Sequence, residues 1–347
     1  MDKRGIELQF HWIFVMVAGA LILVFFISVA NKQSALSQER LQLTLASDVE
    51  NIFTGAIVSR GAAQRLPIPP QGLSFECSQG CDCRFMVGKA ARPFGDKPLF
   101  APSELKDQDV VVWALELKLP YRVTNLLYLT NPNVKYYLVD PKEGPLQSLH
   151  AQFVKSIPPL IHYDNITLDE IPSLQSEDYP FTKFIFFDSN PSFSPPSLDG
   201  SFRREEFSAV KLDSQGINFY RNSGSNFVQD GYVPWTGMAS AFAAMFAQDR
   251  VMYECSMQTV FRKLSYLSGI YSGRAKVLSE NAVETGRLLC AYEGDDAVLG
   301  LLERQNVAAN KVRQGVKSND LRELTDLASR LEAKNRELVQ QSCAGVF

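Results

Sequence analysis

The feature that most constrains this chain is an apolar run from Phe10 to Ala30 that contains no Asp, Glu, Lys or Arg. A helix rises about 1.5 Å per residue, so a run of this length spans the roughly 30 Å hydrocarbon core of a bilayer. His11 and Trp12 lie at its start, where the membrane interface favours amphipathic rings. The sequence therefore predicts a transmembrane helix over residues 10–30 that anchors the chain in membrane lipid.

A cleaved secretory signal is the alternative interpretation of this run, because Ser28 and Ala30 supply small residues at the end of it. The hydrophobic region of a signal peptide has only about 7 to 15 residues, and the run here is longer. The length therefore favours an anchor that stays in the mature protein.

The orientation of the anchor depends on indirect signals, because two basic residues precede the run and two follow it shortly afterwards. A tight group of cysteines and the acceptor sequon at Asn165 lie beyond the run, and both are typical of the oxidising side of a membrane. We therefore expect residues 1–9 to be a short cytoplasmic N-terminus. The remainder is expected to be the extracellular domain of a single-pass protein of the cell membrane.

Residues 31–60 contain no proline and carry apolar residues at three- or four-residue spacing. The apolar positions are Leu41, Leu45, Val49, Ile52 and Ala56. This spacing puts the apolar side chains on one face of a helix, with polar residues between them. Gly61 and the prolines from Pro67 to Pro70 then end the helical pattern. The sequence predicts that the membrane helix continues as an amphipathic stalk over residues 31–60.

A short basic start, Lys3-Arg4-Gly5, precedes the apolar and amphipathic halves of this long helix, which leads into a distal head. Over residues 1–58 this layout resembles that of type IV pilin-like surface proteins, including archaeal ones. The resemblance implies that a dedicated peptidase cuts after Gly5 and that the first helix packs with copies of itself. The sequence departs from that family at Phe10, the fifth residue after the cut, where pilins usually carry Glu.

The sequence pattern over residues 61–235 predicts a head of mixed α/β type. The fold class expected for the whole chain is α+β or α/β. Two alternating stretches, 73–77 and 81–87, flank a Ser-Gln-Gly turn and indicate a β-hairpin. An alternating strand follows over 111–119. Strands are then expected over 134–139, 160–166, 183–187, 207–212, 217–220 and from 227 onward, with a helix over 145–156.

Residues 236–347 are predicted to be helical, with helical segments over 237–271, 280–316 and 319–341. An acidic break at residues 293–296 interrupts the second of these segments. The uncharged run 231–247 falls short of the about 20 apolar residues that a second span needs, so a buried core helix is expected there. The last helix carries Leu324, Leu331 and Leu338 at heptad spacing. Together with the stalk helix, this seam is a candidate surface for self-association or a protein partner, and packing within the chain is the favoured alternative.

Six cysteines are disulfide candidates: Cys77, Cys81, Cys83, Cys255, Cys290 and Cys343. The hairpin brings Cys77 within reach of Cys81 or Cys83 across its turn. Because three cysteines lie in the hairpin and three in the helical part, complete pairing within the chain needs at least one bridge between the two parts. Closely spaced thiolates can also chelate a metal, but no second pair with matching spacing follows. We therefore expect disulfides and no metal site.

The charge and the motifs give no sign of nucleic-acid binding or of a known catalytic class. The chain has 35 basic and 38 acidic residues and no long basic run. It lacks a glycine-rich phosphate loop, a nucleophile elbow, a zinc-binding helix motif and an EF-hand loop. His150 and His162 could act as bases but lie outside any triad pattern. Two Ser-x-x-Lys matches, at 103–106 and 208–211, lack the companion motifs of enzymes with that spacing.

Asp140 and Asp188 each end a predicted apolar strand, and the carboxyl ends of parallel strands are where ligands and metal-binding carboxylates collect. Asp before a proline-containing turn is also ordinary loop chemistry. We expect the turn role, and so we assign no catalytic, cofactor-binding or metal-binding residue and expect no cofactor.

The leading hypothesis is a membrane-anchored extracellular protein that acts as a non-enzymatic structural or interaction component of a cell-surface assembly. One alternative is a pilin-like filament or pseudopilus subunit that is processed after Gly5. Another is an ectoenzyme or ligand receptor that uses Asp140 and Asp188.

Overall fold

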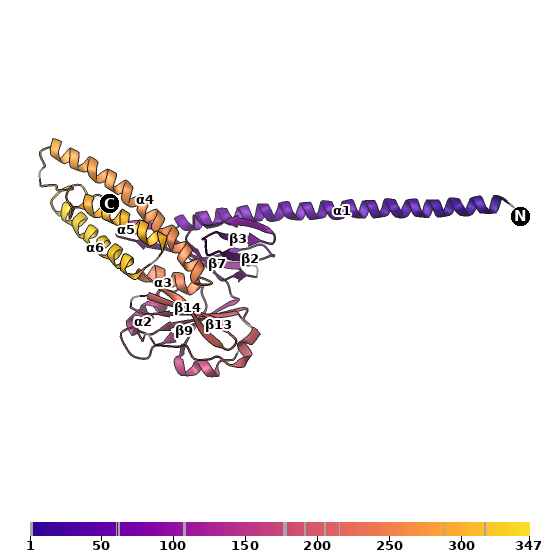
Figure 1. Ribbon diagram of the computed structural model, residues 1–347, viewed down its shortest axis with the longest axis horizontal. Coiled ribbons are helices and arrows are strands. Elements are labelled where there is room, and N and C mark those ends of the chain that lie inside the picture. Colours follow the sequence, from indigo (N-terminus) through magenta and orange to yellow (C-terminus); the bar gives the residue numbers. More distant parts are fainter. Residues whose placement is uncertain are drawn as a thin grey trace.

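The computed structural model describes residues 3–59, 61, 63–106, 109–175, 179–190, 192–204, 206–214, 216–287, 289–315 and 317–347. It consists of one long N-terminal helix that projects from a head of three β-sheets and a helical part (Figure 1). An N-terminal apolar helix, mixed sheets and C-terminal helices were all predicted, and all three are observed.

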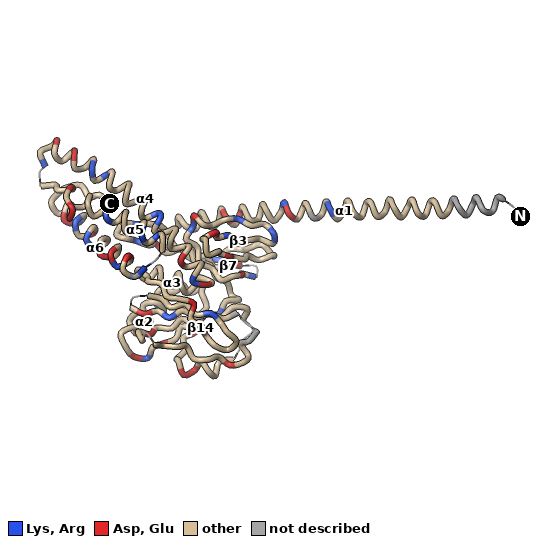
Figure 2. The backbone as a smooth tube through the Cα atoms, viewed as in Figure 1, with Lys and Arg blue, Asp and Glu red and all other residues tan. Residues whose placement is uncertain are grey.

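Helix α1 (Lys3–Val58) is a single 56-residue helix, so the apolar run and the stalk form one continuous element as predicted. It is long and apolar enough to cross a membrane, and within the described residues no other helix is. Figure 2 shows that charged residues lie on the head and on the part of α1 near it, whereas the described outer part of α1 carries none. The part of α1 nearest the head, which we call its base, differs from the exposed outer part. Its residues Ala46, Val49 and Phe53 are buried in the head.

Two small sheets receive the base of α1, which contacts strands of both. The first sheet has the order β1-β7-β8-β5, and the second, β4-β3-β2-β6, is antiparallel. The strands of the first are β1 (Ala63–Pro67), β7 (Asp109–Lys118), β8 (Arg122–Thr130) and β5 (Leu99–Phe100). The strands of the second are β4 (Ala90–Pro93), β3 (Cys83–Val87), β2 (Leu73–Cys77) and β6 (Glu104–Leu105). The predicted hairpin is the β2–β3 pair, with Cys77 opposite Cys83.

The largest sheet has the order β10-β9-β11-β12-β13-β14. Its first four strands are parallel, and the last two pair antiparallel. The strands are β9 (Val134–Asp140), β10 (Tyr163–Thr167), β11 (Phe181–Phe187), β12 (Glu206–Leu212), β13 (Gly216–Ser223) and β14 (Asn226–Pro234). The predicted strand over 160–166 begins later, at Tyr163, because Ile161 closes a turn with Pro158.

The two faces of this sheet are covered by different elements. Helix α2 (Gln147–Ser156) covers one face, where Phe153 contacts Phe187. The 3-10 helices η1 (Leu168–Ser173) and η2 (Gly200–Arg204) cover the other, where Ile171 and Phe202 belong to a separate core with Phe186. The sheet is therefore a covered α/β layer and supplies two distinct cores.

Four helices make up the C-terminal part: α3 (Gly237–Phe246), α4 (Arg250–Glu284), α5 (Val298–Gln314) and α6 (Ser318–Gln340). The helix predicted over 237–271 is wrong as one element, because it is interrupted after Phe246. Asp249 begins α4 by accepting a hydrogen bond from the backbone N–H of Met252, which caps a new helix. Helix α3 is buried almost throughout, as expected of a core helix.

The break predicted at the acidic residues 293–296 within the helical segment 280–316 is confirmed. It is longer than expected, because helix α4 ends at Glu284 and α5 begins only at Val298. Helices α4, α5 and α6 pack side by side (Figure 1). The three heptad leucines, Leu324, Leu331 and Leu338, are buried in the main core within the chain.

Candidate functional site

A cleft lies at the carboxyl ends of strands β9 and β11. Strand β9 leaves the sheet through α2 on one face, whereas β11 leaves through the segment that contains η2 on the other face. Neighbouring parallel strands whose connections diverge in this way leave a crevice between them, which is where ligands bind in open α/β sheets. The fold therefore makes this edge the first place to look for a site.

The cleft contains a cavity of about 250 Å³ between these strand ends. Both strand-end carboxylates line it: Asp140 is the last residue of β9 and Asp188 follows β11. Phe186, Phe187 and Phe193 line its apolar part. The structure thus places the two predicted candidates at one cavity, which the sequence could only suggest.

Each of these two carboxylates also holds a turn. Asp140 Oδ1 accepts a hydrogen bond from the backbone N–H of Lys142 (2.9 Å), and Asp188 Oδ1 accepts one from the backbone N–H of Asn190 (2.6 Å). These are the local hydrogen bonds that favour Asp in turns. Each carboxylate is therefore partly occupied by its own loop.

The two carboxylates face opposite sides of the sheet. Side chains alternate along a strand, so Asp140 follows Leu138 onto the α2 face, whereas Asp188 follows Phe186 onto the η2 face. The electrostatic contacts agree with these opposite directions. The charge of Asp140 acts to raise the pKa of His150 on α2, whereas the charge of Asp188 acts to raise the pKa of Tyr220 in the other core. The strand ends therefore share a cavity without forming a carboxylate pair. Within the described residues no group of three or more His, Cys, Asp or Glu side chains could hold a metal ion.

The charge of the cleft is negative. Asp140, Glu143, Asp169 and Asp188 line it, and Lys142 is the one basic residue among its described lining. The Lys142 ammonium forms an ion pair with Asp169, which raises the pKa of the lysine further above its usual value. Sequence analysis missed Lys142 and Asp169, because they become neighbours only when β9 and β10 pair in parallel.

The two histidines that sequence analysis considered do not line this cavity. His150 lies on α2 with 8% of its surface exposed, and its ring meets Phe187 edge to face. Its Nε2 atom is buried and has no hydrogen-bond partner among the described residues. Burial lowers its pKa, and the Asp140 charge and a hydrogen bond with Asn165 oppose that shift. His162 is exposed in the turn before β10.

The Ser208–Lys211 match does not form a nucleophile–base pair in the geometry of its strand. Ser208 and Lys211 lie three residues apart on β12, so their side chains leave opposite faces of the sheet. Lys211 is 1% exposed and its Nζ donates to the backbone carbonyl of Asn190 at 2.7 Å. In the other match, Lys106 forms an ion pair with Glu104.

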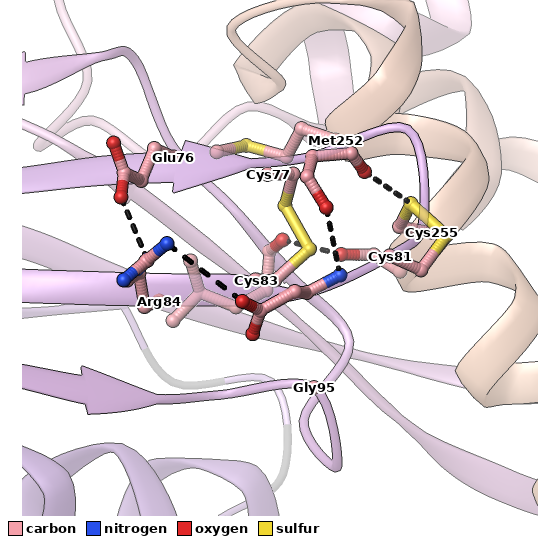
Figure 3. Close-up of a disulfide and its surroundings, with 12 residues drawn as sticks. Glu76, Cys77, Cys81, Cys83, Arg84, Gly95, Met252 and Cys255 are labelled. Carbon is pink, nitrogen blue, oxygen red and sulfur yellow. Dashed lines mark hydrogen bonds and ion pairs between the residues drawn. A yellow bond between two sulfur atoms is a disulfide. The ribbon is translucent and has the colours of Figure 1, made fainter.

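All six cysteine candidates are joined in pairs. The disulfides are Cys77–Cys83, Cys81–Cys255 and Cys290–Cys343. The first crosses the hairpin, and the second is the bridge between hairpin and helices that odd cysteine counts required (Figure 3). The third joins the connection after α4 to the end of α6, near the C-terminus.

Two further candidate residues concern modification rather than binding. Asn165 is exposed on β10, which is an edge strand of the large sheet. Its sequon is therefore accessible at the surface of the head. Gly5 lies within the first turns of α1.

Comparisons with protein-family models, with curated proteins and with solved structures found no significant match.

Proposed function

We propose that this protein is a single-pass, membrane-anchored surface protein whose head acts as a non-enzymatic structural or interaction component of a cell-surface assembly. In this proposal α1 crosses the membrane, its N-terminus is cytoplasmic, and the head is extracellular. The observation that supports this proposal most is the change in burial along helix α1. Phe25 is 63% exposed in the apolar half, whereas Phe53 is 1% exposed in the base that packs into the head.

The arrangement separates the head from the bilayer. Between Ala30, the end of the apolar run, and Ala46, the first buried residue of the base, the helix rises roughly 25 Å. Most residues of the stalk in this interval are polar, and Leu36, Leu41 and Leu43 are exposed among them. A rigid stalk of this length supports a role in which the head meets partners away from the lipid surface.

Three disulfides and the exposed sequon at Asn165 support the extracellular location of the head. The test is protease protection in intact cells that express the chain with one epitope tag at each end. We expect added protease to remove the C-terminal tag and spare the N-terminal one. Removal of the N-terminal tag alone would overturn the proposed orientation.

A pilin-like subunit is a second candidate function. It is favoured by the way the base of α1 packs on sheet strands while the apolar half projects freely (Figure 1). Such a subunit would be cut after Gly5 and would associate through the exposed half of α1. N-terminal sequencing of the mature protein separates the two: a chain that starts at Ile6 supports the filament subunit, and an uncut chain supports the permanent anchor.

A ligand receptor or ectoenzyme is a third candidate, favoured by the cavity at the strand ends. The negative lining suits a cationic group, and the phenylalanines suit an apolar body beside it. Calorimetric titration with divalent cations, described in the Discussion, tests the cation-binding form of this function.

A further inference from the structure

We propose that a second cavity, between the β2–β3 hairpin, helix α4 and the end of α5, binds the oxyanion group of a small soluble ligand, such as a phosphate. We call it the cationic cavity and define it by Cys81, Lys97, Cys255, Gln258, Arg262 and Arg313, which lie in its lining. Its volume is about 270 Å³.

The lining of this cavity concentrates positive charge. Lys97, Arg262 and Arg313 come from three different segments and converge on this cavity, while no Asp or Glu is found in its described lining. The whole chain has a formal charge of -3, so this concentration of positive charge runs against the average. Cavities lined by one sign of charge concentrate ions of the opposite sign.

The two arginines of the cavity keep free hydrogen-bonding capacity, whereas Lys97 does not. The Lys97 ammonium donates to Glu50 and to both carboxylate oxygens of Asp96, so it contributes charge to the cavity but is already paired. Arg262 donates from Nη2 to the backbone carbonyl of Gly95 at 3.0 Å, and its other nitrogens have no hydrogen-bond partner among the residues that the structure describes. Arg313 makes no hydrogen bond or ion pair within the part of the chain that the structure describes. Guanidinium groups bind phosphate and carboxylate with two parallel hydrogen bonds.

Arg262 and Lys97 also act together on a neighbouring lysine. Lys263 lies beside Arg262 on α4, and its pKa is lowered mainly by burial. The charges of Arg262 and Lys97 lower it further, although Asp96 acts in the opposite direction. The charges of two of the cavity's cations thus reach the same neighbouring residue.

Disulfides and hydrogen bonds hold the walls of the cavity in place. The Cys81–Cys255 disulfide joins two walls of the cavity, and the Cys77–Cys83 disulfide stabilises the hairpin beside it (Figure 3). Thr259 Oγ1 donates to the Gly95 carbonyl at 2.7 Å, so the loop at Gly95 is held to α4 from the same side as Arg262. A site that is ordered before binding loses less entropy when it binds.

The position of the cavity indicates where the ligand comes from. Lys97 pairs with Glu50 on α1, and Glu50 lies roughly 30 Å along the helix from Ala30. The choice of a soluble ligand rests on the proposed membrane anchor: with residues 10–30 of α1 in the bilayer, a lipid headgroup does not extend that far. The volume admits a phosphate or a small phosphorylated molecule, so the ligand class is a soluble oxyanion.

The test uses full-length protein in a non-ionic detergent and phosphate-free buffer at constant ionic strength. Isothermal titration with inorganic phosphate and with pyrophosphate is expected to show saturable binding in the wild-type protein. Arg313→Gln should weaken it about tenfold or more, which is the usual effect of losing hydrogen bonds to a charged group. Arg65→Gln is the matched control, because Arg65 is exposed on β1 and lies outside the cavity.

Because Arg313 is itself exposed near the end of α5, its substitution is expected to leave the fold intact, and a thermal unfolding curve without ligand checks this. Three results would overturn the proposal: no binding of either anion, equal binding by wild type and Arg313→Gln, or equal weakening by Arg65→Gln. A titration with anionic lipid vesicles that competes with phosphate would instead assign the site to a lipid headgroup and would also contradict the proposed soluble ligand. None of these outcomes affects the membrane anchor.

Discussion

Cys81 and Cys255 are 174 residues apart in the sequence, and their disulfide fastens the β2–β3 hairpin to helix α4. Because the hairpin sheet also contacts the base of α1, the bridge links the stalk-bearing part of the head to the helical part. Closing a loop of this length in the unfolded chain contributes on the order of 2–5 kcal/mol to stability. The continuous core supports the same connection, since it extends from Ala46 to Val346.

The disulfide pattern gives the first prediction. Mass spectrometry of unreduced peptides from protein isolated from its native compartment should find Cys77–Cys83, Cys81–Cys255 and Cys290–Cys343. A reduced and alkylated sample serves as the control and should lose all three linked peptides. Six freely alkylated thiols in the unreduced protein would refute the pattern and would favour metal binding by the hairpin cysteines.

The second prediction concerns the base of α1. Phe53 is 1% exposed and its ring lies 5.3 Å from that of Phe85, so Phe53→Ala removes a packed aromatic side chain from the core. We expect the free energy of unfolding to fall by about 3–5 kcal/mol. The neighbouring Ile52 is 36% exposed, and Ile52→Ala should cost much less. Equal effects in urea denaturation would contradict the docking of this helix.

The third prediction concerns pH. Burial lowers the pKa of His150, so below the unfolded value of about 6.5 the unfolded chain binds more protons than the folded chain. Stability is therefore expected to decrease as the pH falls from 7 to 5. His150→Leu should make this decrease smaller, whereas His162→Leu, at an exposed position, should leave it unchanged. Denaturant midpoints at several pH values measure the effect, and identical pH profiles for wild type and His150→Leu would disprove it.

The fourth prediction concerns the strand-end cleft. Because Asp140 and Asp188 face opposite sides of the sheet and each holds a turn, we expect no specific micromolar binding of Mg²⁺ or Ca²⁺ there. The double variant Asp140→Asn, Asp188→Asn should therefore leave function unchanged. Calorimetry on full-length protein checks this. Specific micromolar binding that either single substitution abolishes would make these carboxylates the first candidates for catalysis.

The sequence was most informative where periodicity was strong. The apolar run, the stalk, the hairpin and the strands around Val139 and Phe186 were found because their patterns match a helix or a strand directly. Strand β8 was missed, because it is buried on both faces and shows no alternation. The break before α4 was also missed, although Asp249 is a typical N-cap residue.

The functional candidates were harder to predict, because their geometry is tertiary. Asp140 and Asp188 were identified from strand ends, but their opposite directions depend on the register between β9 and β11. The cationic cavity had no sequence signal at all, because Lys97, Arg262 and Arg313 lie on three segments far apart in the chain. Only the fold brings these cations together.

The most direct test of the proposed anchor is N-terminal sequencing of the protein after alkaline carbonate extraction of membranes. The account predicts that the protein stays in the membrane pellet and retains residues 10–30. A soluble protein whose sequence begins at Asn31 would contradict the anchor.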